Sequence, residues 1–334
     1  MTSRAMTPLS VLDLIPVREG GSVAESLTEA AKTAQVAERA GYARYWVAEH
    51  HGMDGIAGGA TSVVLAHIGA ATSKIRIGAG GIMLPNHTPY VIAEQFGTLD
   101  AMFPGRVDLG LGRAPGADGR LAYALRKDIR QASEVFPQDV VELRARFEGQ
   151  ALHGVAAPQA AGAKVEMWIL GSSTFGAQLA AMLGLPYAFA SHFAPAQLDQ
   201  AAAIYRERFE PSETLDKPHF MAAINVMAAD TDEEAWYLAS TNDQAFVALR
   251  SGTPGRAKPP IRGYRETLRP HELAMLDQMR SVSAIGSPET VRAGLEAFVR
   301  RTQADELILS GSTYDPEAMR RSLQLTMDAV RQPA

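Results

Sequence analysis

Short apolar runs alternate with helical patterns along the whole chain, and this alternation restricts the fold more than any other feature of the sequence. Eight such runs are present, and each is followed by a helical region. Their length and composition are typical of buried parallel strands. They cover residues 9–15, 42–48, 75–79, 106–111, 166–170, 187–190, 220–227 and 307–309. Eight βα units in 334 residues fit a TIM barrel better than a doubly wound sheet.

We therefore predict an α/β protein with a TIM (β/α)8 barrel, formed as a single domain over residues 1–334, because no linker or shift in composition divides the chain. One segment interrupts this alternation of strands and helices. Residues 250–265 are rich in proline, glycine and basic side chains, as long loops that act as lids often are. We predict a mobile lid insertion over residues 250–282, after the seventh strand. A solvated insertion without any role in ligand binding is the alternative.

Composition excludes several classes of protein. The chain has no cysteine, so disulfide scaffolds, zinc–thiolate sites and cysteine nucleophiles are ruled out. Lys and Arg total 32 and Asp and Glu total 37, which gives a net charge of −5 and predicts no nucleic-acid partner. No apolar run approaches the ~18 residues of a membrane span, and residues 1–8 do not form a signal peptide. These features favour a cytoplasmic enzyme.

The carboxyl ends of the strands are where a TIM barrel places its chemistry. The second predicted strand ends in Glu49-His50-His51, and histidine titrates near neutral pH. Because consecutive side chains point in different directions, at most one of His50 and His51 can face the barrel mouth. Asp108 falls inside a strand, as does Asp13, and we expect both to be hydrogen-bonded within the barrel.

Glycines recur at the ends of the third and fourth strands. Gly80, Gly81 and Gly112 could together form a wall against a planar ring, because glycine lets a backbone lie close to a ligand. The alternative is that βα turns simply favour glycine.

An arginine and a serine-rich turn follow the fourth and fifth strands. Arg113 offers a guanidinium group that suits a phosphate. Ser172, Ser173 and the Gly176 amide lie where a helix begins, and helix N-termini bind anions. These residues predict a phosphate site, against the alternative of an ordinary helix cap and a surface arginine. A metal site made by Glu49, His50 and His192 is disfavoured, since the first strand lacks a His-x-His pair, and we predict no metal.

The order of these motifs resembles the bacterial luciferase-like flavin monooxygenases. The resemblance covers nearly the whole chain and is closest to single-subunit oxidoreductases of unassigned substrate. The motifs that carry it are Glu49-His50-His51 and residues 78–85, 105–113, 170–173, 184–186, 191–193 and 285–290.

The resemblance implies a barrel that binds FMN at its C-terminal mouth. It implies a phosphate held by Arg113 and the serine turn, a cis peptide at Gly80-Gly81, and a functional histidine at His50. In that family reduced FMN and O2 form a flavin C4a-peroxide, which oxidises a small organic substrate. Electrons would come from NAD(P)H through a separate, transiently bound flavin reductase, because no nicotinamide domain is visible.

Two features differ from luciferase itself. Gly112 stands where luciferase has a cysteine, which argues against light emission. A homodimer through the apolar helix at residues 60–72 is expected in place of the partner subunit of luciferase. Two alternative functions stay open, namely a deazaflavin-dependent enzyme that transfers hydride and a non-catalytic flavin-binding protein.

Overall fold

The computed structural model of the chain describes residues 6–114 and 119–332, and its centre is a closed barrel of parallel strands. Each strand pairs in parallel with its neighbours, and the last barrel strand returns to the first with Leu9 opposite Leu307. The barrel strands are β1 (Leu9–Asp13), β2 (Arg44–Val47), β3 (Arg76–Met83), β4 (Val107–Gly112), β5 (Glu166–Gly171), β6 (Tyr187–Phe189), β7 (Phe220–Ala228) and β9 (Glu306–Ser310). The predicted TIM barrel is confirmed.

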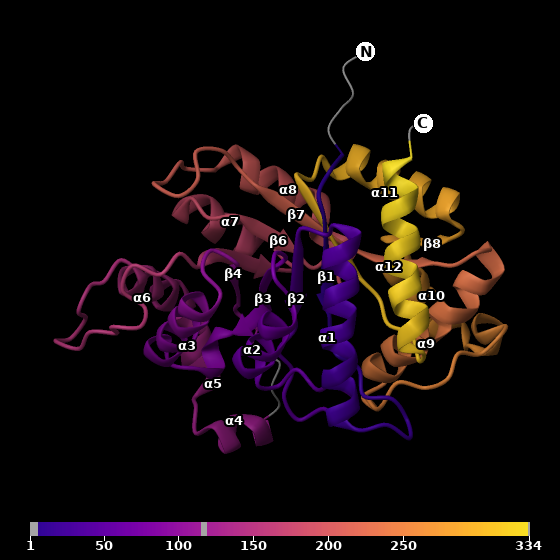
Figure 1. The fold of residues 1–334 in the computed structure, drawn as a ribbon, viewed down its shortest axis with the longest axis horizontal. Coiled ribbons are helices and arrows are strands. Elements are labelled where there is room, and N and C mark those ends of the chain that lie inside the picture. Colours follow the sequence, from indigo (N-terminus) through magenta and orange to yellow (C-terminus); the bar gives the residue numbers. More distant parts are fainter. Residues whose placement is uncertain (1–5, 115–118, 333–334) are drawn as a thin grey trace, which may run out of the picture.

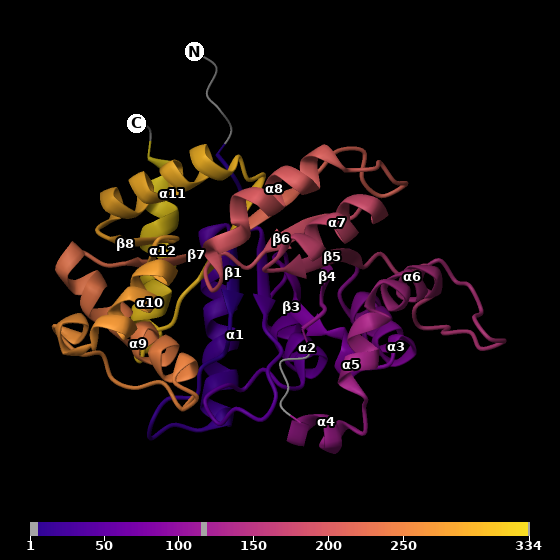
Figure 2. The ribbon, with the colours of Figure 1, turned by 180° about the vertical axis from the view of Figure 1, so that it is seen from behind.

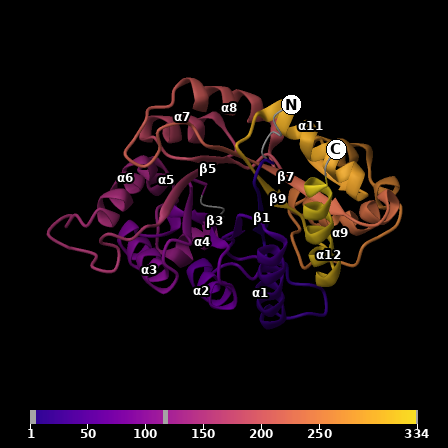
Figure 3. The ribbon, with the colours of Figure 1, turned by 45° about the horizontal axis from the view of Figure 1, so that its top comes forward.

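Helices surround the strands on all sides (Figure 3). The main helices between the barrel strands are α1 (Val23–Ala40), α2 (Thr61–Ala71), α3 (Pro89–Met102), α6 (Phe136–Phe147), α7 (Thr174–Leu183), α8 (Leu198–Glu207), α9 (Asp232–Arg250), α11 (Pro288–Thr302) and α12 (Pro316–Arg331). The first and last of them lie side by side and complete the ring (Figure 1).

Local sequence explains where the helices begin and end. Ser22 and Glu25 form the expected capping box at the start of α1, and Gly41 ends that helix with φ of 87°, a conformation that glycine adopts without strain.

The segment between β7 and β9 is more structured than the sequence indicated. The extra strand β8 (Ser283–Gly286) pairs with β7 outside the barrel. It was missed because four residues between two helices carry too little pattern, whereas the long β7 offers a free edge beyond its barrel partners. Residues 250–282 include the 3₁₀ helix η3 (Tyr264–Thr267) and α10 (Pro270–Arg280), seen beside α9 in Figure 2. The mobility of this lid segment stays a prediction.

The connection after β4 also contains more helix than expected. It holds α4 (Gly119–Leu125) and α5 (Ile129–Glu134) before α6. Two further 3₁₀ helices, η1 (Leu84–Asn86) and η2 (Pro195–Gln197), follow β3 and β6. In the described part of the chain, we find no helix that is both long and apolar enough to cross a membrane.

Tryptophans fill the middle of the barrel. Trp46 and Trp168 meet edge to face with ring centroids 5.3 Å apart, and Leu12 and Ile308 pack around them. The neighbouring strand carries glycine because a Cβ atom at Gly80 would lie 2.7 Å from Leu12 Cδ1. Large rings on two strands therefore require small residues on the strands beside them.

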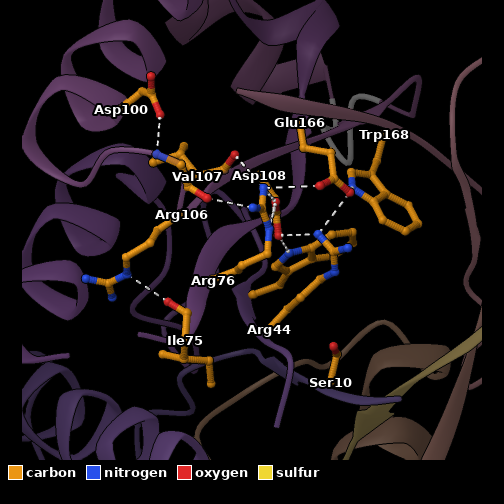
Figure 4. A network of polar contacts seen from close by, with 12 residues as sticks. Ser10, Arg44, Ile75, Arg76, Asp100, Arg106, Val107, Asp108, Glu166 and Trp168 are labelled. Atoms are coloured by element: carbon orange, nitrogen blue, oxygen red, sulfur yellow. Dashed lines mark hydrogen bonds and ion pairs between the residues drawn. The ribbon is translucent and has the colours of Figure 1, made fainter. Parts of the chain in front are cut away.

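Charged side chains close the end of the barrel that is formed by the amino ends of the strands (Figure 4). Arg44 Nη1 lies 2.9 Å from Asp108 Oδ2 and 3.0 Å from Glu166 Oε1, and Arg76 pairs with the same two carboxylates. The fully buried Asp108 also accepts a hydrogen bond from Trp46 Nε1 at 2.8 Å. Asp13 accepts one from the Ile15 amide at 2.7 Å and another from Tyr45. The expected hydrogen bonding of both aspartates is confirmed.

Candidate active site

A cavity of about 540 Å³ opens at the carboxyl ends of β2 to β6, and we call it the main cavity. Its volume falls within the range of cofactor and ligand pockets in proteins. All eight predicted site residues line it, although they come from four different βα connections. These residues are His50, Gly80, Gly81, Gly112, Arg113, Ser172, Ser173 and Gly176. The barrel therefore brings the predicted residues into one space.

The glycines on the cavity wall differ in what surrounds them. The Gly80-Gly81 peptide bond is cis, as the resemblance implied. A Cβ atom at Gly81 would lie 2.6 Å from the Gly110 carbonyl oxygen, so packing alone excludes any side chain there. A Cβ atom at Gly112 would meet only the Ile82 carbonyl oxygen, at 3.7 Å. Gly112 thus leaves open space in the cavity, where a flat group could lie against the backbone.

The serine turn forms the N-terminus of α7. Ser173 is the N-cap residue, yet its side chain makes no capping hydrogen bond. The ordinary cap that was the alternative interpretation is therefore not formed. The first amides of α7 carry the partial positive charge of a helix N-terminus, and Ser172, Ser173 and Gly176 line the cavity beside them.

Arg113 extends this positive region. Its guanidinium group lies 4.0 Å from the centroid of the Phe175 ring, and Phe175 belongs to the first turn of α7. No ion pair joins Arg113 to a carboxylate within the described residues. A guanidinium stacked on a ring next to a helix N-terminus is an arrangement suited to a phosphate group.

His50 follows β2 and also lines the main cavity. Burial lowers the pKa of His50 below its usual value of 6.5, and the charge of His51 acts in the same direction, while Glu49 opposes both. The imidazole is consequently neutral at pH 7. A neutral imidazole can accept a proton at one nitrogen while it donates a hydrogen bond from the other.

His51 points elsewhere, as the adjacency of the two histidines predicted. Its Nε2 lies 2.6 Å from Glu49 Oε1, and His87 Nε2 lies 2.8 Å from the same oxygen. Glu49 Oε2 accepts a hydrogen bond from the Met83 amide at 3.1 Å. Burial favours the neutral acid, but the hydrogen bonds from His87 and His51 outweigh it and lower the pKa of Glu49. This buried carboxylate therefore ties the end of β2 to the segment after β3.

The metal alternative does not match this geometry. In the chain as described, the one group of three metal-ligand side chains close together is Glu49, His51 and His87. His50 lines the main cavity instead, and His192 is not part of that group.

Several lining residues escaped the sequence analysis. Glu49 was considered only as a metal ligand, whereas Met83, Phe136, Leu170, Phe175, Ala190 and Phe193 also line the main cavity. The strand-end rule could have found Leu170 and Ala190, since both sit at or next to the ends of their strands. Phe136 and Phe193 come from a helix start and a loop, and only the tertiary structure brings them to the cavity.

Comparison with known proteins identifies the family. The sequence profile described as "Luciferase-like monooxygenase" matches residues 7–306 of the chain. The chain belongs to this family. A luciferase-like monooxygenase of Escherichia coli strain K12 is 46% identical to it over 98% of both chains. The N-acetyl-S-alkylcysteine monooxygenase of Bacillus subtilis strain 168 is 32% identical over 97% of this chain and 98% of that protein.

Solved structures agree with this membership. The crystal structure of apo-MsnO8 superposes with a TM-score of 0.85 at 32% identity, covering 97% of this chain and 98% of that one. The same fold at lower identity is found in two further proteins. One is the FMN complex of the oxygenating constituent of 3,6-diketocamphane monooxygenase from Pseudomonas putida, with a TM-score of 0.70, 19% identity and 96% coverage of each chain. The other is an F420-dependent secondary alcohol dehydrogenase, with a TM-score of 0.72, 17% identity and coverage of 98% and 100%. As a luciferase-like monooxygenase family member, the protein is an oxidoreductase.

Proposed function

We propose that the protein is an FMN-dependent monooxygenase that uses externally reduced flavin and O2 to oxidise a small organic substrate. The supporting observation is the positive region made by Arg113 and the N-terminus of α7, which lacks a side-chain cap, on the wall of the main cavity. The FMN-bound structure of a fold relative agrees with this choice.

The remaining cavity suits the flavin ring. The open space beside Gly112 accommodates a flat group, and Leu170 and Phe193 provide apolar surface along the same cavity. When bound, reduced FMN supplies two electrons to O2, so that one oxygen atom enters the substrate and the other leaves as water. The apolar lining excludes water from the reacting atoms.

His50 is the proton-transferring group in this proposal. Its neutral imidazole accepts a proton or donates a hydrogen bond at the cavity face, and Glu49 fixes the backbone around it through the Met83 amide. We assign the electron supply to NAD(P)H through a separate flavin reductase that binds transiently. We also propose that the reaction takes place in the cytoplasm.

Replacing Arg113 with alanine is expected to weaken FMN binding by about 1.5–3 kcal/mol, the contribution of a hydrogen bond to a charged group, which corresponds to roughly 10- to 150-fold in Kd. Quenching of flavin fluorescence during titration measures this change.

Riboflavin is the matched control, because it has the ring and lacks the phosphate. Its affinity should be the same for the wild type and for Arg113→Ala, and Arg300→Ala on the exposed surface of α11 should change neither ligand. Equal weakening of FMN and riboflavin by Arg113→Ala would remove the phosphate assignment.

Oxygen chemistry separates the proposed function from its two alternatives. The protein is loaded with chemically reduced FMN and mixed with ¹⁸O2 and candidate substrates, and products are analysed by mass spectrometry. Incorporation of one ¹⁸O atom per product molecule is expected. Anaerobic substrate turnover with a reduced deazaflavin would indicate hydride transfer instead, whereas tight FMN binding without any turnover would indicate a flavin-binding protein.

We further propose a homodimer through α2. Val63 on this helix is 69% exposed, and the neighbouring α3 exposes Val91 and Met102. Exposed apolar side chains on neighbouring helices can become buried in a symmetric dimer, in which both subunits use the same surface. Light scattering at micromolar concentration should give twice the chain mass, and Val63→Arg should give the mass of one chain.

A further inference from the structure

A second cavity of about 150 Å³ lies beside the main cavity, and we call it the side cavity. It is bounded by β1, β7 and β9 near their carboxyl ends and by helix α9, and Pro254, Gly255 and Ala257 of the lid segment form another wall. Phe193 lines both cavities. A molecule in the side cavity would therefore lie next to whatever occupies the main cavity.

Contacts with two other loops hold the lid segment beside this space. The Ala257 amide donates a hydrogen bond to the Val17 carbonyl oxygen at 2.9 Å. The Glu19 amide donates one to the Ala257 carbonyl oxygen, also at 2.9 Å. Arg256 Nε lies 2.7 Å from Asp54 Oδ2. These contacts bring Pro254, Gly255 and Ala257 against the loops after β1 and β2, so that the lid segment forms one side of the side cavity.

The described side chains that line the side cavity share one property, which is that they do not belong to acidic or basic residues that are charged at neutral pH. None of the described residues that line the side cavity is an aspartate, glutamate, lysine or arginine. Arg250 stacks on the rings of Phe193 and Phe246 but does not itself line the cavity. His192 does not supply a charge either, because burial lowers its pKa to about 4. Transferring an ionised carboxylate or ammonium group into such surroundings is strongly unfavourable unless a partner compensates the charge. The side cavity thus selects against charged molecules.

The size of the side cavity and the polar groups on its wall further restrict which ligand it can bind. An apolar cavity of about 150 Å³ is large enough to hold one benzene ring. Leu14, Met53, Ile56 and Met279 supply apolar surface to the side cavity. Asn242 also faces it, and Asn242 Oδ1 accepts a long hydrogen bond of 3.4 Å from Ser312 Oγ. The Asn242 amide hydrogens make no hydrogen bond within the described residues, so they can donate to an acceptor on a ligand.

We infer that the side cavity is the substrate subsite, and that it takes a compact, uncharged molecule of about one ring that carries a single hydrogen-bond acceptor for the Asn242 amide. Its role as a substrate subsite rests on the proposed flavin chemistry in the main cavity. The binding preference itself is a property of the chain and can be measured without any turnover.

Acetophenone and benzoate form a matched pair of probes, because they share the ring and the carbonyl and differ in a methyl group against a charged oxygen. Ligand-detected NMR on the flavin-free protein, repeated with oxidised FMN bound, gives both dissociation constants. We expect acetophenone to bind at least 10-fold more tightly than benzoate. Equal binding of the two probes, or no binding of acetophenone, would overturn the inference.

Three variants test whether the probes bind in the side cavity. Asn242→Lys places a cation in the side cavity and should reverse the preference in favour of benzoate, whereas the neutral control Asn242→Leu should weaken acetophenone alone. Leu249→Trp, at a partly exposed position of the wall, should block acetophenone and leave FMN affinity unchanged. An unaltered probe ratio in Asn242→Lys would place the probes elsewhere.

The FMN titration keeps this inference separate from the proposed function. If FMN binds and the probes do not, the subsite is wrong while the flavin proposal stands. If the probes bind as expected and FMN does not, the flavin proposal is wrong while the selectivity of the side cavity stands.

Discussion

Replacing His50 with alanine is expected to lower the rate of substrate oxidation by about 10²- to 10⁴-fold, the usual contribution of a positioned acid or base. The imidazole lines the main cavity and is neutral at pH 7 because burial lowers its pKa. Alanine removes the proton-transferring nitrogens and leaves the phosphate region intact. Single-turnover product formation with reduced FMN and saturating O2 measures the loss, and FMN affinity should stay within a few-fold of the wild type.

The dependence on pH tests the same assignment more directly. His50 accepts a proton only when it is neutral, which is the case above its pKa. Because burial lowers the pKa of His50, the wild-type rate should be flat near pH 7 and fall only at a pH below the usual histidine range. In His50→Gln this acid limb should vanish, since the amide does not titrate.

His51→Gln is the matched control for this experiment. The neighbouring residue hydrogen-bonds to Glu49 and is not part of the main cavity lining. Its variant should keep the acid limb even if the rate falls modestly. A wild-type rate in His50→Ala, or an acid limb that survives in His50→Gln, would show that another group transfers the proton.

Replacing Asp108 with alanine is expected to reduce the free energy of unfolding by about 3–5 kcal/mol, as is usual when one partner of a buried ion pair is removed. Asp108 is fully buried and pairs with both Arg44 and Arg76 (Figure 4). Its loss also leaves Trp46 Nε1 without an acceptor. Such a change is a large part of the ~5–15 kcal/mol that stabilises a typical domain. Urea unfolding followed by tryptophan fluorescence provides the measurement.

Glu166→Gln is the control for Asp108, because Glu166 pairs with the same two arginines and glutamine keeps an acceptor for Trp168 Nε1. The side chain of Glu166 is 37% exposed, against 0% for Asp108. Solvent weakens ion pairs at exposed positions, so this variant should lose only about 1 kcal/mol or less. If Asp108→Ala does not fold, Asp108→Asn keeps an acceptor for Trp46 and should still lose more than Glu166→Gln, which keeps an acceptor for Trp168. Equal losses in the two variants would contradict a special role for burial.

Much of the fold can be predicted from the sequence, because the spacing of apolar residues indicates which side chains are buried. The eight runs correspond to the eight barrel strands, and the capping box at Ser22 marks the start of α1 as expected. Where the pattern was too short, prediction failed. The strand β8 has four residues and depends on the free edge of β7, which is a tertiary property. The helices α4, α5 and α10 lie in connections that carry no regular apolar repeat of their own.

The candidate site was predictable to a similar degree. The rule that barrel chemistry lies at strand ends, together with the family resemblance, placed His50, Arg113 and the serine turn in one region, and the structure assembles them around the main cavity. The sequence left open whether Ser173 was an ordinary cap and which of His50 and His51 faced the cavity. Both questions concern where side chains point, and packing decides this.

The sequence by itself determined the barrel, the strand-end residues and the family, because alternating burial and ordered motifs are written along the chain. Only the tertiary structure decided what those residues contact. It turned His51 and His87 onto Glu49, left the α7 amides without a side-chain cap beside Arg113, and formed an uncharged side cavity beside the lid segment. These arrangements join residues that lie far apart in the sequence, and no local pattern encodes a contact that exists only after the barrel has closed.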